Sequence, residues 1–253
     1  MASTSTSGAP SAAKTARPRS RRGGLGPTAP APARDLVLHV ALRDTAPPVW
    51  RRLRVPDRLT LHQLHRVLQL AFGWLDYHLY EFTPAPPATR ASTSKRGARG
   101  PQVRRQVRYA EPDPEWDDPD GPAETRDSRR ITLRDLALTR GARLTYLYDF
   151  GDDWAHDISV EQAIAVREGE ADDDDSRPLP MVLDGARAGP PEDAGGVSGY
   201  ERLLAVLADP EHPEHEEMKA WAALWGGAAY DPERFDPWTA NHTLMLVGAW
   251  GAL

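Results

Sequence analysis

The 253-residue chain contains no cysteine. Disulfides, thiolate zinc sites and a cysteine nucleophile are therefore all excluded. No run of apolar residues approaches the roughly 20 that a helix needs to cross a bilayer. The pair Arg21-Arg22 is not followed by the apolar segment that a twin-arginine export signal requires. We therefore expect a cytoplasmic protein that has no membrane partner.

Acidic residues are missing from the N-terminal 34 residues, which carry six Lys and Arg. The rest of the chain contains the other 25 Lys and Arg and all 37 Asp and Glu, so it is strongly acidic. An acidic chain of this kind is not typical of a protein dedicated to binding duplex DNA. Residues 1–34 lack periodic apolar positions, and we expect a disordered basic tail. Such a tail can bind nucleic acid weakly through phosphates, without sequence preference.

Apolar periodicity predicts most of the regular structure. Strands are predicted over 36–42, 49–55, 78–83, 143–148 and 154–161. A helix is predicted from the capping box of Thr60 and Gln63 as far as Gly73. Further helices are predicted over 132–136, 200–208 and 213–224.

Three segments lack such periodicity. Residues 84–130 combine a basic block and an acidic block with prolines, which predicts a long loop or insertion. Residues 168–178 include four consecutive aspartates and are predicted to form a solvated acidic loop. Residues 184–196 are rich in Gly and Pro, which indicates turns.

Several motifs in a fixed order resemble a known family. They lie at 47–52, 60–82, 148–156, 184–200, 212–215 and 230–237. Together they resemble the plasmid pRiA4b ORF-3-like family from about residue 35 to 241, interrupted by 84–130. The residues that carry this signature are Trp50, Gly73, Trp74, Tyr148, Phe150, Gly151, Trp154, Asp184, Gly185, Pro190, Pro191, Glu192, Asp193 and Tyr200.

The resemblance implies an α+β fold. We expect a single compact domain over 35–250, with a mixed or antiparallel sheet and helices packed on it. Relatives described as transposon passengers or resolvases suggest a mobile-element accessory protein. Serine resolvases need an N-terminal nucleophilic serine and a basic C-terminal recognition helix, which do not fit this chain. Cysteines common in the family near Val182, Gly189 and Ala194 are absent here.

The stretch from Tyr148 to Asp157 is the main candidate site, and it has two interpretations. As a metal site it would use Asp149, Asp152, Asp153 and His156, joined by His78; hard oxygens with an imidazole suit Mg²⁺ or Mn²⁺.

As a structural turn, its aspartates would bond nearby backbone N–H groups. Gly151 would then supply a positive φ, and Phe150 and Trp154 would anchor the core. Strand alternation places His156 on the apolar face with Trp154 and away from Asp157.

A second candidate is the arginine group Arg51, Arg52 and Arg54 beside Trp50. Such groups contact phosphates or pair with carboxylates. Our leading hypothesis is a non-catalytic interaction module that has an unknown protein partner and no cofactor. The alternative is a divalent-metal-dependent hydrolase or nuclease that uses the Asp149–Asp157 hairpin.

Overall fold

The computed structural model describes residues 33–85, 106–113, 117, 121–166, 179–226 and 230–249. All of them belong to one compact unit, residues 32–253. Most of the expected basic tail (1–34) and the expected acidic loop (168–178) lie outside the described residues. The strands are β1 (Arg34–Leu42), β2 (Trp50–Pro56), β3 (Tyr80–Pro84), β4 (Gln106–Ala110), β5 (Ala123–Asp127), β6 (Arg143–Tyr148), β7 (Trp154–Ala165) and β8 (Met181–Ala186). The helices are α1 (Leu61–Phe72), α2 (Gly196–Ala208), α3 (His215–Gly226) and α4 (Pro237–Ala249).

The strands form one sheet in the order β5-β4-β3-β6-β7-β1-β2-β8. Neighbours pair antiparallel except β4 and β5, which are parallel. The fold is therefore α+β with a mixed sheet, as the sequence predicted. The hairpin of β6 and β7 is also confirmed: Tyr148 pairs with Trp154 next to the turn.

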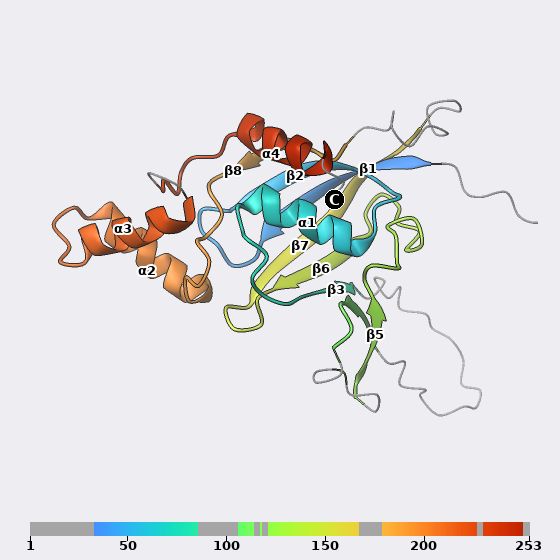
Figure 1. Cartoon of the computed structure of the whole chain (residues 1–253), viewed down its shortest axis with the longest axis horizontal. Coiled ribbons are helices and arrows are strands. Elements are labelled where there is room, and N and C mark those ends of the chain that lie inside the picture. Colours follow the sequence, from blue (N-terminus) through green and yellow to red (C-terminus); the bar gives the residue numbers. More distant parts are fainter. Residues whose placement is uncertain are drawn as a thin grey trace, which may run out of the picture. The chain divides into compact units, whose positions relative to one another are not determined.

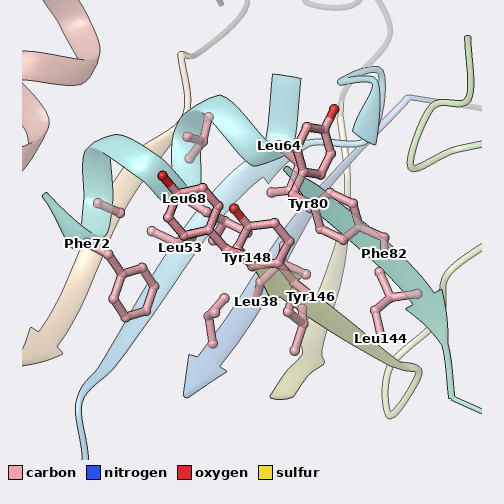
Figure 2. Close-up of a cluster of buried hydrophobic side chains, with 14 of the residues drawn as sticks. Leu38, Leu53, Leu64, Leu68, Phe72, Tyr80, Phe82, Leu144, Tyr146 and Tyr148 are labelled. Carbon is pink, nitrogen blue, oxygen red and sulfur yellow. The ribbon is translucent and has the colours of Figure 1, made fainter. Parts of the chain in front are cut away.

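Helix α1 packs across one face of the sheet (Figure 1). It begins at the predicted capping box, where the Thr60 hydroxyl accepts from the Gln63 N–H and the Gln63 side chain accepts from the Thr60 N–H. It ends at Gly73, whose φ of 88° is readily adopted only by glycine. Leu64 and Leu68 lie against the strands, beside the aromatic residues of β3 and β6, and Phe72 lies further along the helix, against Trp74 and His156 (Figure 2).

The opposite face of the central strands is polar. Arg43, just after β1, pairs with Asp157 of β7, and Arg52 of β2 pairs with Glu161 of β7 across the intervening strand β1. On β7, Trp154, His156, Ile158 and Val160 are buried and alternate with more exposed residues. An antiparallel sheet with one solvated face shows this alternation.

The structure corrects the sequence prediction for residues 84–130. The segment was predicted to be a long loop or insertion; the loop alternative is wrong, because β4 and β5 lie within it and extend the sheet beyond β3. A single residue pair, Phe82 with Tyr109, joins β3 to β4. Tyr109 is buried in the core, so this part of the segment is anchored to the domain.

Two smaller predictions were also wrong. Residues 132–136 form turns instead of a helix, although Thr132 and Asp135 do bond each other as a cap would. The N–H of Leu133 donates to the carbonyl of Leu59, which ties this turn to the start of α1. The Gly185 region, predicted to form turns, includes β8, which pairs with β2 along the sheet edge.

Four helices are described, and none combines the length and the apolar character that a membrane span needs.

Candidate functional site

The β6–β7 turn is a structured loop. Oδ1 of Asp149 accepts a 2.8 Å hydrogen bond from the Gly151 N–H, which is the Asx-type turn that the sequence suggested. The Asp149 N–H donates to the carbonyl of Leu79 and so ties the turn to the strand beside it. Two details of the predicted turn were wrong: Gly151 does not supply the positive φ, and Phe150 is exposed instead of anchoring the core. Asp149 and Asp153 adopt left-handed backbone angles, with φ of 57° and 58°.

The second oxygen of Asp149 belongs to a group that we call the His78 cluster: His78, Asp149 and Asp193. Nε2 of His78 lies 3.6 Å from Oδ2 of Asp149 and 3.2 Å from Oδ1 of Asp193. One potential ligand atom from each of the three residues lies within 4.8 Å of the other two. Asp149 is buried, His78 is partly exposed and Asp193 is exposed. The cluster is therefore open to solvent on one side.

The structure does not bring the other predicted ligands into this cluster. His156 is fully buried, with its ring against Phe72 and Trp74, and burial lowers its pKa to about 3. Its Nδ1 donates to the carbonyl of Trp154. Oδ2 of Asp152 accepts from the Gly195 N–H and braces the start of α2. Asp153 is exposed, and its carboxylate is not part of the cluster.

Sequence reasoning missed Asp193 as a member of the site. The residue belongs to the signature motif at 184–200 and lies far along the chain from both His78 and the turn. Its positive φ of 54° turns the chain immediately before α2. The run Pro190-Pro191-Glu192-Asp193 was the available signal, but only the fold shows which residues it meets.

A buried acidic network lies behind the cluster. Oε1 of Glu192 accepts from the Tyr148 hydroxyl at 3.0 Å and from the Leu75 N–H at 2.8 Å. Glu192 is 1 % exposed, and its Oε2 has no hydrogen-bond partner among the described residues. Burial raises the pKa of Glu192. The Tyr77 N–H donates to the Tyr148 hydroxyl, which links this network to the chain next to His78.

Other signature residues hold the same region together. Nε1 of Trp74 donates to the carbonyl of Pro190, and the rings of Trp74 and Tyr148 lie 5.0 Å apart. Trp154 is fully buried, with its ring 6.5 Å from that of Tyr200 at the start of α2. Residues of three signature motifs, at 60–82, 148–156 and 184–200, therefore meet at the end of the sheet where β6 stops and β3 begins.

Beside the His78 cluster lies what we call the acidic hollow, a cavity of about 350 Å³. Its lining includes three exposed apolar side chains: Tyr77, Leu79 and Phe150, which are 64 %, 44 % and 42 % exposed. Its other walls carry four carboxylates and one arginine, namely Asp76, Glu111, Asp113, Asp117 and Arg108. Exposed apolar groups around a charged hollow are typical of interaction sites.

Strand alternation separates the three predicted phosphate-binding arginines. Arg52 and Arg54 lie on the polar face, 2.8 Å from Glu161 and 2.5 Å from Asp35. Arg51 points to the opposite face and is 1 % exposed. Arg52 and Arg54 are therefore already paired with carboxylates of the sheet.

The fold and this site define an α+β domain that is built on one mixed sheet, with acidic and aromatic groups gathered at one end. Residues 34–239 match the family described as plasmid pRiA4b ORF-3-like protein, and the chain belongs to that family.

Two relatives cover most of the chain. The uncharacterized protein y4hQ of Sinorhizobium fredii (strain NBRC 101917 / NGR234) is 37 % identical over 195 residues, which cover 77 % of this chain and 82 % of that protein. The crystal structure of MM3350, a protein of unknown function from Methanosarcina mazei Go1, matches with a TM-score of 0.59 and 32 % identity. That match covers 82 % of this chain and 96 % of the other.

Proposed function

We propose that this protein is a non-catalytic interaction module that binds a basic, partly apolar segment of a partner protein at the acidic hollow. The observation that carries the proposal is the exposure of Tyr77, Leu79 and Phe150 around a hollow whose lining includes four carboxylates and one arginine. Because the family takes its name from a plasmid, we extend the proposal to an accessory role on mobile elements.

Charge at the hollow favours a cationic ligand. Arg108, the cation among its described lining residues, lies 2.9 Å from Asp117 and 3.5 Å from Glu81. Its charge is therefore shared between two acids. Asp76 and Glu111 have partners of their own outside the lining, at His65 and Arg129 respectively, so carboxylates still outnumber arginines on the wall of the hollow. Charge complementarity of this kind speeds association and selects partners. The exposed aromatic side chains supply the apolar contacts from which binding hot spots are built.

Fluorescence anisotropy with two labelled 12-residue peptides tests this proposal. One peptide alternates Lys with Leu, and the other alternates Glu with Leu. We expect saturable binding of the Lys peptide that weakens as salt is added, and no binding of the Glu peptide. Phe150→Ser should weaken binding by about tenfold, on the scale of one lost apolar anchor. Leu246→Ser, at an equally exposed residue of α4, should leave binding unchanged.

Equal binding of the two peptides would overturn the proposal, and so would equal effects of Phe150→Ser and Leu246→Ser. The assay therefore distinguishes specific binding at the acidic hollow from nonspecific binding by exposed apolar residues.

A second candidate is the divalent-metal-dependent hydrolase or nuclease, now centred on the His78 cluster. It is favoured by the position of Nε2 of His78 between two carboxylates, where the atom is buried and has no properly oriented hydrogen-bond partner among the described residues. One imidazole and carboxylate oxygens suit Mn²⁺ or Mg²⁺. A bound ion would activate a water for attack on an ester or phosphodiester.

Calorimetry with Mn²⁺ and Mg²⁺ distinguishes this candidate from the module. Micromolar Mn²⁺ binding that is lost in Asp193→Asn and kept in Asp153→Asn would establish a metal site at the cluster. Failure to bind Mn²⁺ at millimolar concentration would exclude the hydrolase and leave the peptide result unaffected.

A further inference from the structure

A second cavity, of about 530 Å³, lies between the end of α1, residues 188–191 and the start of α4. We call it the Arg51 cavity. Its walls are mainly apolar, with Phe72, Trp74, Pro190 and Phe235 among them. The described residues that line it are not those that line the acidic hollow. Its volume is in the range of sites for small organic molecules.

Arg51 places a buried positive charge at the wall of this cavity. Its Nε donates to the carbonyl of Ala71, and its Nη1 donates to the carbonyls of Trp50 and Ala186. Its guanidinium lies 4.8 Å from the Phe72 ring and 3.8 Å from the Phe235 ring. No hydrogen bond from Nη2 occurs among the described contacts of Arg51.

Within the described residues, Arg51 has no carboxylate partner. The other two arginines of β2 each have one. Burial lowers the pKa of Arg51 to about 9, and the neighbouring groups that oppose this shift are tyrosines. A buried cation without a counter-ion is costly. Carbonyl dipoles and aromatic faces offset part of that cost, and an anion in the cavity would offset more.

A second donor lines the same cavity. Nε1 of Trp225 is buried and has no hydrogen-bond partner among the described residues. The two carboxylates in the lining, Asp231 and Asp236, already accept hydrogen bonds from neighbouring residues. Asp236 accepts from the Thr239 hydroxyl and the Trp238 N–H at the start of α4, and Asp231 accepts from the Glu233 N–H.

We propose that the Arg51 cavity binds a small organic anion with an apolar body, such as an aryl or alkyl carboxylate. The carboxylate meets the free edge of the Arg51 guanidinium and the Trp225 N–H. The apolar body lies against Phe72, Trp74 and Pro190. This site is distinct from the acidic hollow, because the two cavities share no described lining residue and call for ligands of opposite charge, although the rings of Trp225 and Tyr77, one from each lining, lie 6.3 Å apart.

Calorimetry and thermal unfolding with 4-phenylbutyrate test the proposal, and the neutral 4-phenylbutyramide is the matched control. We expect saturable binding of the carboxylate and a rise in Tm, with the amide at least tenfold weaker. Trp225→Phe keeps an aromatic ring, though a smaller one, and removes the N–H, so it should weaken carboxylate binding severalfold. Trp238→Phe, at an exposed tryptophan outside the cavity lining, should have no effect.

Ala240→Leu places extra volume in the cavity and should reduce the binding of both compounds. Because Arg51 also supports the fold, the test relies on these variants and not on its removal. Absence of saturable 4-phenylbutyrate binding at millimolar concentration would overturn the proposal. Equal affinity for acid and amide, or unchanged binding in Trp225→Phe, would overturn it as well. A negative result here would not affect the peptide assay.

Discussion

The Tyr148 hydroxyl donates a 3.0 Å hydrogen bond to Oε1 of Glu192, which lies 44 residues further along the chain. The bond joins the end of β6 to the segment before α2. The same carboxylate oxygen accepts from the Leu75 N–H, so three separate parts of the chain meet at one atom. This buried junction fixes the position of the neighbouring Asp193 and hence the geometry of the His78 cluster.

Removing the Tyr148 hydroxyl should therefore destabilise the fold. Tyr148→Phe leaves a buried carboxylate with one fewer donor, and such losses typically cost about 1–3 kcal/mol. Urea unfolding measures the change. Tyr77→Phe removes a hydroxyl from an exposed tyrosine and should change stability by less than about 0.5 kcal/mol. Similar effects of the two substitutions would show that the Tyr148–Glu192 bond contributes nothing.

Glu192→Gln should make stability less sensitive to pH. Burial raises the pKa of Glu192 in the folded protein, so the native state holds this proton more tightly than the unfolded chain does. That contribution is present at low pH and is lost as pH rises from about 4.5 through the folded pKa. Glutamine keeps the acceptor oxygen without the charge.

We therefore expect the stability difference between Glu192→Gln and wild type to shift in favour of the variant as pH rises from about 5 to 8. Urea unfolding at several pH values measures this difference. A difference that stays constant across the range would contradict the buried, raised-pKa carboxyl.

His156 should make stability fall in acid. Burial lowers its pKa to about 3, whereas the unfolded chain binds the proton near pH 6.5. The unfolded state therefore binds more protons between these values, and stability should fall as pH drops below about 6, by on the order of 1.4 kcal/mol per pH unit. His156→Phe should flatten this dependence, as measured by unfolding at pH 4 to 7. His242→Phe, on the exposed side of α4, should leave the dependence intact.

Gly189 allows the segment before α2 to approach the end of α1. A Cβ at this position would lie 2.1 Å from the carbonyl oxygen of Phe72, which is backbone and cannot move alone. Gly189→Ala should therefore destabilise the protein by about 1–3 kcal/mol, the usual cost of overpacking. In Gly151→Ala the nearest atom is a side-chain oxygen of Asp149 at 3.2 Å, so the cost should be smaller. Differential scanning calorimetry compares them, and equal Tm values would refute the close approach.

Capping residues and apolar alternation in the sequence correctly predicted the elements whose formation depends on nearby residues. Thr60 and Gln63 fixed the start of α1, and Gly73 fixed its end. Alternation along β7 correctly placed His156 in the core, apart from the carboxylates of the turn. These features depend on residues that are close together in the sequence, so the sequence pattern alone can predict them.

The rest depends on contacts between distant residues. The Gly185 region reads locally as a turn, but it includes β8 because β2 offers it an edge to pair with. The strands β4 and β5 lie in a charged, proline-rich segment with little apolar alternation. Likewise, the sequence could not show that Asp193 meets His78, because that contact depends on how the end of α1 packs against residues 188–193.

The placement of β1 has a consequence for how the chain folds as it is made. This strand lies between β2, which follows it directly, and β7, which ends at Ala165. The register joins Arg34 to Ala165 and Leu42 to His156. During synthesis β1 can pair with β2 early, but its other edge must wait until more than a hundred further residues have left the ribosome. The N-terminal hairpin therefore emerges with an open, apolar edge, and completion of the sheet is a late, long-range step.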